Sequence, residues 1–590
     1  MGEKISIWLV GNTGLRNPLR ITDGLRVFAA SKFNAENQLH ERENEVAFMD
    51  LLNEKGIIHN QAGKDPSGSH ARKWRLMFER NGFIYPKLTP KNEIAQKQIG
   101  PADVLTPFGK KILKADTYPA IQECFLRSLS VETKQIPDTH LYFSPLRWVL
   151  SIMLELEKRT GSSDFNRIEF ALWGETTNPS YNLNFVVDNI LKLRQARKVA
   201  PSKRNFDKEA INERAKNYDH EKHNFLDYAD MNMRYLRIGG VLQRKGRGLT
   251  IAPSKHILAE QLAKSTGSEV KKLDQYRMLV NGAPLPSDNI VVARAILKNL
   301  ESQLKEQHIL YDISDLSLNT AIDVNIARRR LEDIQFKTNE VSYAAKQKDE
   351  WVEIVDYMTL LENGGGKHEY DEDNMIEIPK DETPAYFEWV IWRALLAIDH
   401  LSNAPGKVRN FRLDSDFLPV STAGGGKGDL YGEFKDFVIL TEVTMSTSSR
   451  QEAMEGEPVR RHVSDAMLEY QKPVYGLFLA VKIDINTVET FRHGIWYTNE
   501  DQCQKLKILP LTLHQFKYFF EYLFENKKND PEYLKELIRQ CVAQKDSFTA
   551  PQWKQYIDKT IYNIVSQDNH RFIAAESKFK VDTYLDKPKS

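Results

Sequence analysis

The spacing of apolar residues predicts helices in the first part of the chain. In FSPLRWVLSIMLELEKRT the apolar positions recur every three or four residues, as they do on one face of a helix. Ser144 and Pro145 suit the N-cap and the first helical position of that segment. A second helix is expected directly afterwards, over SSDFNRIEFALW, with Ser163 or Asp164 as its cap.

Two stretches of the N-terminal half share a weak repeated pattern. Residues 73–113 and 232–258 each show a helical pattern that ends near a glycine, then a short β pair, the dipeptide LT and a further helix start. In the second stretch, VLQRKGRGLTIAP is typical of two strands around the turn KGRG. A helix followed by such a hairpin is the ending of a winged helix, whose recognition helix fits the DNA major groove.

Basic residues lie where a winged helix would contact DNA. Lys or Arg at a wing tip meets phosphates without reading the base sequence. The alternative is that winged helices also bind proteins, and exposed turns are often basic. The candidate DNA-binding residues are Arg72, Lys73 and Arg75 on the first helix and Arg244, Lys245 and Arg247 on the second wing.

The C-terminal part changes from a helical pattern to a mixture of helices and strands. Residues 286–380 are mostly helical and charged, and their end, ENGGGKHEYDEDNM, indicates a loop or a domain boundary. Residues 382–400 then predict a helix with a broad apolar face. Beyond it FLPV, DLYGE and FVILTEVT are typical of strands, EPVRRHVSDAMLEYQ of a crossover helix and VYGLFLAVKI of a further central strand.

Composition and charge narrow the class of protein. A chain of 590 residues suggests three or four domains. No window approaches about 18 uninterrupted apolar residues, no secretory signal is recognised, and three dispersed cysteines form no CxxC pair, so we expect a cytoplasmic, intracellular protein. Residues 1–265 hold 41 basic and 30 acidic residues, a net charge of +11, whereas the remainder holds 41 and 51, a net charge of −10. This asymmetry favours contact between the N-terminal half and a polyanion.

The strongest candidate chemistry lies in GGGKGDLYGEFKDFVILTEVTMS. It is not a Walker A loop, because Lys427 is followed by glycine and Asp429, and a strand stands where a helix should begin. Antiparallel pairing of the two strands would bring Asp429 and Glu442 to one edge of a sheet, as a site for Mg²⁺. Glu388, on the preceding apolar helix, either pairs with Arg393 or points into that site.

These residues carry a family resemblance. The order of Glu388 on a helix, Asp429, then Glu442, Val443 and Thr444 resembles the core of the PD-(D/E)XK nucleases. The blocks FEW, DFVILTEVT, MEGEPVRRH and ILPLTLHQF more closely resemble the AlwI-type family of type IIS restriction and nicking endonucleases. The resemblance implies an α/β nuclease domain, DNA as substrate and Mg²⁺ held at Asp429, Glu442 and Val443.

The sequence departs from the PD-(D/E)XK pattern at one position. Most of these nucleases carry a lysine two residues after the second acidic residue, but here, two residues after Glu442, the residue is Thr444. By the resemblance Glu455 completes the site, and Glu457 and Lys427 are the alternatives. The catalytic candidates are therefore Glu388, Asp429, Glu442 and Glu455.

The expected architecture is a multidomain α+β protein. Its predicted parts are winged-helix DNA-recognition subdomains at 1–130 and 131–285, a helical linker at 286–380, and a PD-(D/E)XK-like cleavage domain at 381–590. The leading hypothesis is an endonuclease that recognises a short asymmetric duplex sequence and cuts a few bases away, one strand per subunit, so that a double cut needs a second catalytic subunit. The alternative is a winged-helix DNA-binding regulator with an inactive nuclease-like domain.

Overall fold

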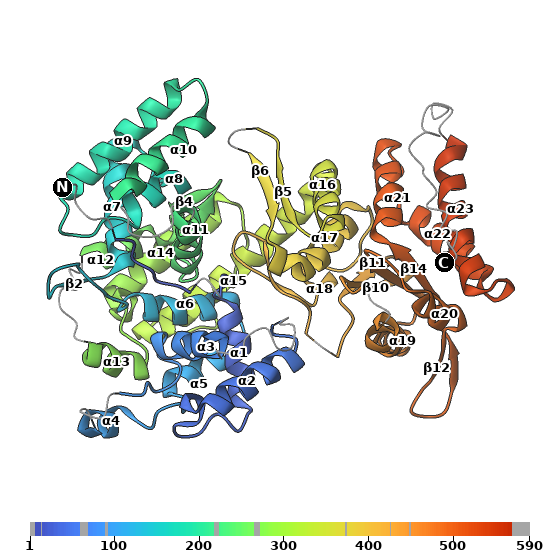
Figure 1. Ribbon diagram of the computed structural model, residues 1–590, viewed down its shortest axis with the longest axis horizontal. Helices are drawn as coiled ribbons and strands as arrows, with labels where there is room; N and C mark the ends of the chain where they lie inside the picture. Colours follow the sequence, from blue (N-terminus) through green and yellow to red (C-terminus); the bar gives the residue numbers. More distant parts are fainter. Residues whose placement is uncertain are drawn as a thin grey trace, which may run out of the picture. The chain divides into compact units, whose positions relative to one another are not determined.

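The computed structural model shows a mostly helical α+β protein with a small mixed sheet (Figure 1). It describes residues 6–12, 15–58, 69–88, 93–217, 224–264, 272–371, 374–424, 426–447 and 450–568. None of the helices in these ranges combines the length and the apolar character needed to cross a membrane. The described chain divides into two compact units, unit 1 with residues 1–338 and 414–416, and unit 2 with residues 339–413 and 417–590.

Unit 1 is built from helices with short two-stranded sheets between them. Its sheets pair β1 (Lys134–Gln135) with β2 (Tyr142–Phe143) and β3 (Leu242–Lys245) with β4 (Gly248–Ile251). Its helices are α1 (Arg20–Ala29), α2 (Arg42–Glu54), α3 (Ser69–Arg80), α4 (Glu93–Ile99), α5 (Pro107–Leu113), α6 (Tyr118–Leu129), α7 (Pro145–Thr160), α8 (Arg167–Glu169), α9 (Leu183–Val199), α10 (Lys203–Arg214), α11 (Asn224–Arg237), α12 (His256–Lys264), α13 (Lys272–Val280) and α14 (Ile290–Glu306). Helix α15 (Ala321–Lys346) begins in unit 1 and ends in unit 2.

The predicted helix after Ser144 is confirmed, but the cap of the next helix is different. Helix α7 begins at Pro145, directly after Ser144, which occupies the N-cap position but makes no side-chain capping hydrogen bond. Helix α8 begins later than predicted because Asn166, rather than Ser163 or Asp164, accepts hydrogen bonds from the backbone N–H groups of Ile168 and Glu169, both at 2.9 Å. The Ser163 hydroxyl oxygen instead accepts from a backbone N–H of β4, which holds this segment extended.

The two copies of the predicted repeat fold differently. The second consists of α11, the antiparallel hairpin β3–β4 and α12, as its sequence predicts. In the first, α3 and α5 are present, but the expected β pair is a single bridge between Ile84 and Leu105, with α4 between them. A hairpin forms only in the second copy, because there a two-residue turn closes the pair between Lys245 and Gly248.

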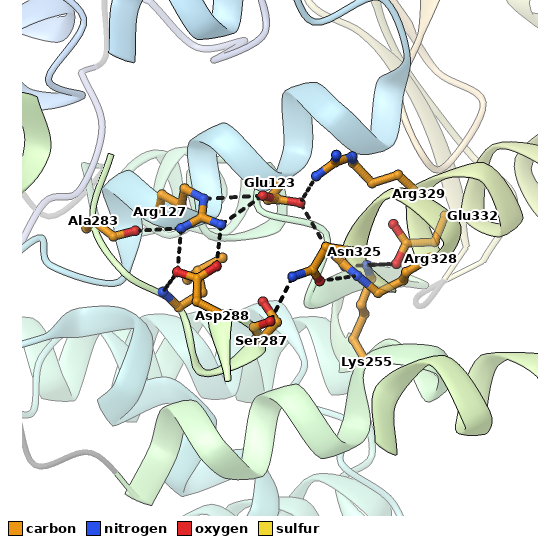
Figure 2. A network of polar contacts seen from close by, with 11 residues as sticks. Glu123, Arg127, Lys255, Ala283, Ser287, Asp288, Asn325, Arg328, Arg329 and Glu332 are labelled. Atoms are coloured by element: carbon orange, nitrogen blue, oxygen red, sulfur yellow. Dashed lines mark hydrogen bonds and ion pairs between the residues drawn. The ribbon is translucent and has the colours of Figure 1, made fainter. Parts of the chain in front are cut away.

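A buried network of charges joins α6 to the first part of α15 in unit 1 (Figure 2). Glu123 accepts hydrogen bonds from Arg127, Arg328 and Arg329, at 2.8 to 3.2 Å. Burial alone would raise the pKa of Glu123, but the three guanidinium groups outweigh it and lower that pKa to about 2. Glu123 is therefore ionised, and its charge holds the two helices together.

Unit 2 contains a four-stranded mixed sheet in the order β14-β11-β10-β9. Strand β9 (Leu430–Glu433) is antiparallel to β10 (Val438–Thr444), while β11 (Val474–Ala480) is parallel to β10 and β14 (Ile508–Thr512) is parallel to β11. Strand β11 is buried along its whole length, as an apolar run between parallel neighbours should be. The predicted strands DLYGE, FVILTEVT and VYGLFLAVKI are thus confirmed.

Helices cover this sheet and connect its strands. Helix α17 (Thr383–Ala397) confirms the predicted apolar helix, and α19 (Gln451–Glu469) is the predicted crossover between β10 and β11. The other unit 2 helices are α16 (Trp351–Glu362), α18 (Pro405–Val408), α20 (Ile485–His493), α21 (Leu513–Glu525), α22 (Pro531–Ala543) and α23 (Ala550–Asp568).

Two sequence expectations for unit 2 differ from the structure. The stretch ENGGGKHEYDEDNM is not simply a loop, since β5 (Gly366–Glu369) and β6 (Met375–Ile378) form a hairpin there. Alternate residues of β6 are buried, a pattern hidden in the sequence by the glycines and acidic residues before it. The strand at FLPV, β8 (Pro419–Ser421), pairs with β7 (Arg412–Leu413) as a separate sheet. A further hairpin joins β12 (Ile495–Tyr497) to β13 (Cys503–Lys505).

Candidate active site

Asp429 and Glu442 face each other across the hairpin β9–β10. The register pairs Thr441 with Leu430, and its continuation by one residue sets Glu442 opposite Asp429. The two carboxyl groups are hydrogen-bonded to each other. Asp429 Oδ2 also accepts a hydrogen bond of 2.9 Å from the backbone N–H of Val443. The hairpin therefore fixes both acidic groups through the backbone.

Glu388 supplies a third buried carboxyl group, from α17. Its side chain accepts a hydrogen bond of 2.7 Å from the backbone N–H of Ala423, just after β8. Arg393, the alternative partner considered from the sequence, is bound instead to Glu353 at 2.7 Å and to Glu350 at 2.9 Å. The expected pairing of Glu388 with Arg393 is thus not formed.

Glu455 reaches the same place from α19. It is half-buried, it is hydrogen-bonded to Thr444, and its charge acts on both Asp429 and Glu442. The Thr444 hydroxyl therefore holds a carboxylate in place.

Glu457 and Lys427, the two alternatives to Glu455 predicted from the sequence, are both exposed. Glu457 is exposed and forms an ion pair of 3.0 Å with Arg461, one turn along α19. Lys427 is exposed in the loop before Asp429. Of the three, the structure brings Glu455 to the other carboxylates.

Burial raises the pKa of all four carboxyl groups, and repulsion from a neighbouring carboxylate adds to it for Glu388, Asp429 and Glu442. Burial is the largest cause for Glu388 and Asp429, followed for each by a neighbouring carboxylate, Asp429 and Glu442 respectively. Burial and then the charge of Glu455 raise the pKa of Glu442 to about 8, and burial raises the pKa of Glu455 itself. Groups crowded in this way retain protons at neutral pH unless a cation compensates their charge.

A histidine that sequence reasoning missed touches this site. His462 lies on α19, two helical turns after Glu455, and its Nδ1 is 2.6 Å from Glu442 Oε1. The side chain is buried, and burial and then the charge of Arg461 lower its pKa. Its other nitrogen, Nε2, is buried without a hydrogen-bond partner. The spacing of seven residues was the available signal, because residues two turns apart lie on one helix face.

The donor set fits a hard divalent cation. Within the described part of the chain, no Lys or Arg forms an ion pair with any of the four carboxylates. A Cβ added to Gly428 would lie 3.0 Å from Glu442 Oε1, so the glycine keeps that side of the carboxylate open. Carboxylate and carbonyl oxygens are the ligands that Mg²⁺ prefers. Asp429, Glu442 and the Val443 carbonyl are the residues that would hold it.

A second polar cluster lies in unit 1. His40 Nδ1 is 2.8 and 2.9 Å from the two oxygens of Asp103, and its Nε2 is 3.6 Å from Glu79. Among the described residues, only this group brings three His, Cys, Asp or Glu ligand atoms within 4.8 Å of one another. Arg75 lies 3.7 Å from Glu79 and 3.5 Å from Glu45. The charged groups of the cluster are thus paired with one another, and Arg75, one of the predicted DNA contacts, is paired with its Glu79.

The other predicted DNA contacts are more accessible. On α3, Arg72 is exposed and Lys73 is half-exposed. The turn of β3–β4 presents three exposed basic side chains, and Lys245 among them forms an ion pair of 2.7 Å with Asp164. These three are Arg244, Lys245 and Arg247.

Comparison with known proteins identifies the class and the family of this protein. A family model described as AlwI restriction endonuclease matches residues 80–519, which is more than half of the chain. The protein is therefore a restriction endonuclease, a hydrolase of phosphodiester bonds. It belongs to the AlwI restriction endonuclease family.

Two solved structures show a weaker likeness. The small subunit (R.BspD6I2) of the heterodimeric restriction endonuclease R.BspD6I is 24% identical with a TM-score of 0.27, over 36% of this chain and 98% of that chain. The restriction endonuclease FokI is 11% identical with a TM-score of 0.23, over 88% and 96% of the two chains. TM-scores this low do not establish a shared arrangement. A comparison with curated proteins gives no match.

Proposed function

We propose that this restriction endonuclease has a type IIS layout, in which one part reads a short asymmetric duplex sequence and another cuts a few bases away. The observation that carries the proposal is the pair Asp429 and Glu442, held opposite each other on a hairpin and joined by Glu388 and Glu455. A regulator with an inactive nuclease-like domain is disfavoured, because the four acidic groups are linked by electrostatic interactions.

Unit 2 supports a PD-(D/E)XK-like cleavage domain at about residues 381–590. Helix α17, the hairpin β9–β10, the crossover α19 and the parallel strand β11 follow one another along the chain. This resembles the order of such a core, with two strands of the main sheet rather than three before the crossover. The acidic groups lie on the first three of these elements. The sheet is the rigid support that a precise site needs.

The residues of the site have different proposed roles in the attack of water on the phosphodiester bond. Bound Mg²⁺ would lower the pKa of a water molecule and offset the charge that develops on the phosphate. Asp429, Glu442 and the Val443 carbonyl would hold the ion, Glu388 and Glu455 would orient water or a second ion, and His462 would position Glu442. With Thr444 in place of lysine, a second ion is the simplest source of the missing positive charge.

Residues 1–285 are proposed to recognise DNA, with subdomains at 1–130 and 131–285 and a helical linker at 286–380. The second subdomain supports this best, because α11 and the hairpin β3–β4 form a helix and a basic wing. Since the part of the chain that the structure describes contains one such site, we propose that each chain cuts one strand. A double cut then needs a second copy or a smaller catalytic partner.

Sequencing the ends of plasmid fragments produced with Mg²⁺ tests this layout. We expect breaks at a fixed distance to one side of a short asymmetric sequence, with nicks in one strand at low protein concentration. Cuts inside a palindromic sequence would contradict the separation of reading and cutting, and breaks without any common sequence would contradict site recognition.

A further inference from the structure

The helical hairpin α9–α10 carries a dense run of positive charge. Residues 189–206 contain six Lys and Arg residues and no Asp or Glu. The run covers the end of α9 and the start of α10, which lie side by side in unit 1 (Figure 1). None of these residues belongs to the wing or the helix considered above, so the charge is a separate feature.

Two arginines of this run are fixed by bidentate ion pairs. Arg194 donates to Glu169 at 2.7 and 2.9 Å, which ties α9 to α8. Arg197 donates to Asp207 at 2.8 and 2.9 Å, which ties α9 to α10. Bidentate pairs of this kind hold a definite geometry. These two pairs therefore give the hairpin a defined geometry at this surface.

A pocket of about 240 Å³ opens at this surface. Its polar lining consists of Asn166, Glu169, Arg194, Arg197, Lys198 and Lys203. Four cations and one carboxylate line it; that carboxylate accepts both hydrogen bonds from Arg194, and Arg197 is paired with Asp207 beside the pocket. The side chains around the pocket thus carry more positive than negative charge, and an excess of one sign concentrates ions of the other, so the pocket favours an anion.

The pocket is linked to the basic wing by one short segment of the chain. Phe165 pairs with Leu249 of β4 through two backbone hydrogen bonds, of 2.8 and 2.9 Å, and Asp164 binds Lys245 at the wing turn. Asn166, the next residue, already lines the pocket. One extended segment thus leads from the wing to α9–α10. A strip of separate basic sites suits a polyanion with regularly spaced charges, and duplex DNA has such a backbone.

We infer that this pocket binds a backbone phosphate of the duplex, beyond the phosphates that meet the wing. The inference rests on the proposed role of residues 1–285 in DNA recognition. Lys198 and Lys203 are the side chains that contact the phosphate, while Arg194 and Arg197 fix the walls of the pocket. The contact is independent of base sequence and adds affinity and register rather than specificity.

The test is DNA binding by the full chain without divalent metal, measured by fluorescence anisotropy at several salt concentrations. The probe is a duplex of about 40 base pairs taken from a plasmid that the enzyme cuts, a length that spans about four helical turns. The variant Lys198→Ala/Lys203→Ala removes the two pocket lysines. Its matched control, Lys192→Ala/Lys208→Ala, removes two exposed charges from the same helical hairpin outside the pocket.

We expect the pocket variant to bind about 5- to 20-fold more weakly at physiological salt. The slope of log affinity against log salt should fall by about 0.9, since one phosphate contact is lost. The control should stay within about twofold of the wild type. Equal affinities for the pocket variant and the wild type overturn the inference, and so does an equal loss in both double variants, which indicates a general effect of charge. If the wild type binds no duplex at all, the proposed recognition role fails as well, so the two failures are distinguishable.

Discussion

His462 Nδ1 and Glu442 Oε1 are 2.6 Å apart, and both side chains are buried. The contact joins the crossover helix α19 to the end of strand β10, where the acidic groups converge. A histidine in this position restricts the rotation of Glu442 and holds one of its oxygens. We therefore assign His462 a positioning role.

Replacement of His462 tests that role. His462→Ala should lower the cleavage rate by about 10- to 100-fold, in line with lost partners of metal ligands, and should raise the Mg²⁺ concentration needed for half-maximal rate. His462→Asn should recover part of the loss, because its amide nitrogen lies near the place of Nδ1. Equal Mg²⁺ dependence in the wild type and both variants, with only thermal stability changed, would show a purely structural role.

The raised carboxyl pKa values predict how the metal-free protein responds to pH. Glu442 titrates near 4.5 when unfolded and near 8 when folded, so between these values the folded state binds more protons and stability falls as pH rises. Thermal unfolding without metal should therefore occur at lower temperature at pH 8 than at pH 5. Mg²⁺ should raise the midpoint more at pH 8, because its ligands are then ionised more readily.

The same repulsion predicts a stabilising variant. Asp429→Asn should raise the unfolding temperature of the metal-free protein at pH 8, because it removes a group that is repelled by Glu442. It should also abolish the gain in stability from Mg²⁺. Calorimetry with Glu457→Gln as control tests this, because Glu457 is exposed and paired with Arg461. A destabilised Asp429→Asn would contradict the proposed repulsion.

Glu455 should matter more than its neighbour Glu457. Glu455→Gln is expected to lower the cleavage rate by at least about 100-fold, or about 2.7 kcal/mol of barrier, without unfolding the protein. Thr444→Val, which removes the hydroxyl bound to Glu455, should cost about 3- to 10-fold, or about 0.7–1.4 kcal/mol. Single-turnover rates measure both effects. A rate within about threefold of the wild type for Glu455→Gln would make it a surface carboxylate of α19.

The charge network of unit 1 predicts a local effect on stability. Glu123→Gln leaves Arg127, Arg328 and Arg329 without their shared anion and should destabilise this region by about 3–5 kcal/mol. Hydrogen exchange in α6 and in the first turns of α15 should become faster. Asp315→Asn breaks only an exposed pair with Arg330 and should leave exchange there unchanged. Unchanged exchange in Glu123→Gln would refute the proposed role of the network.

The sequence predicted the elements around the site because their patterns are strong and local. The apolar run before Glu442 predicts a strand, and the turn before that run predicts its pairing with the preceding strand. This pairing sets Asp429 opposite Glu442. The cap at Asn166 was missed because Ser163 and Asp164 are equally good caps, and only the pairing of Phe165 with Leu249 excludes them.

Contacts between distant residues were harder to predict. Arg393 and Glu388 lie on one helix, yet the arginine binds Glu350 and Glu353. The partner of a buried charge depends on which helices pack together, and a single sequence does not contain that information. His462 was missed for the same reason, although its spacing from Glu455 on α19 marked it.

Cleavage of supercoiled plasmid with Mg²⁺ by Asp429→Ala and Glu442→Ala, with DNA binding measured in parallel, tests the central claim most directly. Both variants should lose at least about 1,000-fold in rate, or about 4 kcal/mol of barrier, and should bind the duplex as tightly as the wild type. Glu457→Ala should cut normally. Cleavage at the wild-type rate by either Asp429→Ala or Glu442→Ala would contradict the assignment of the active site to this hairpin.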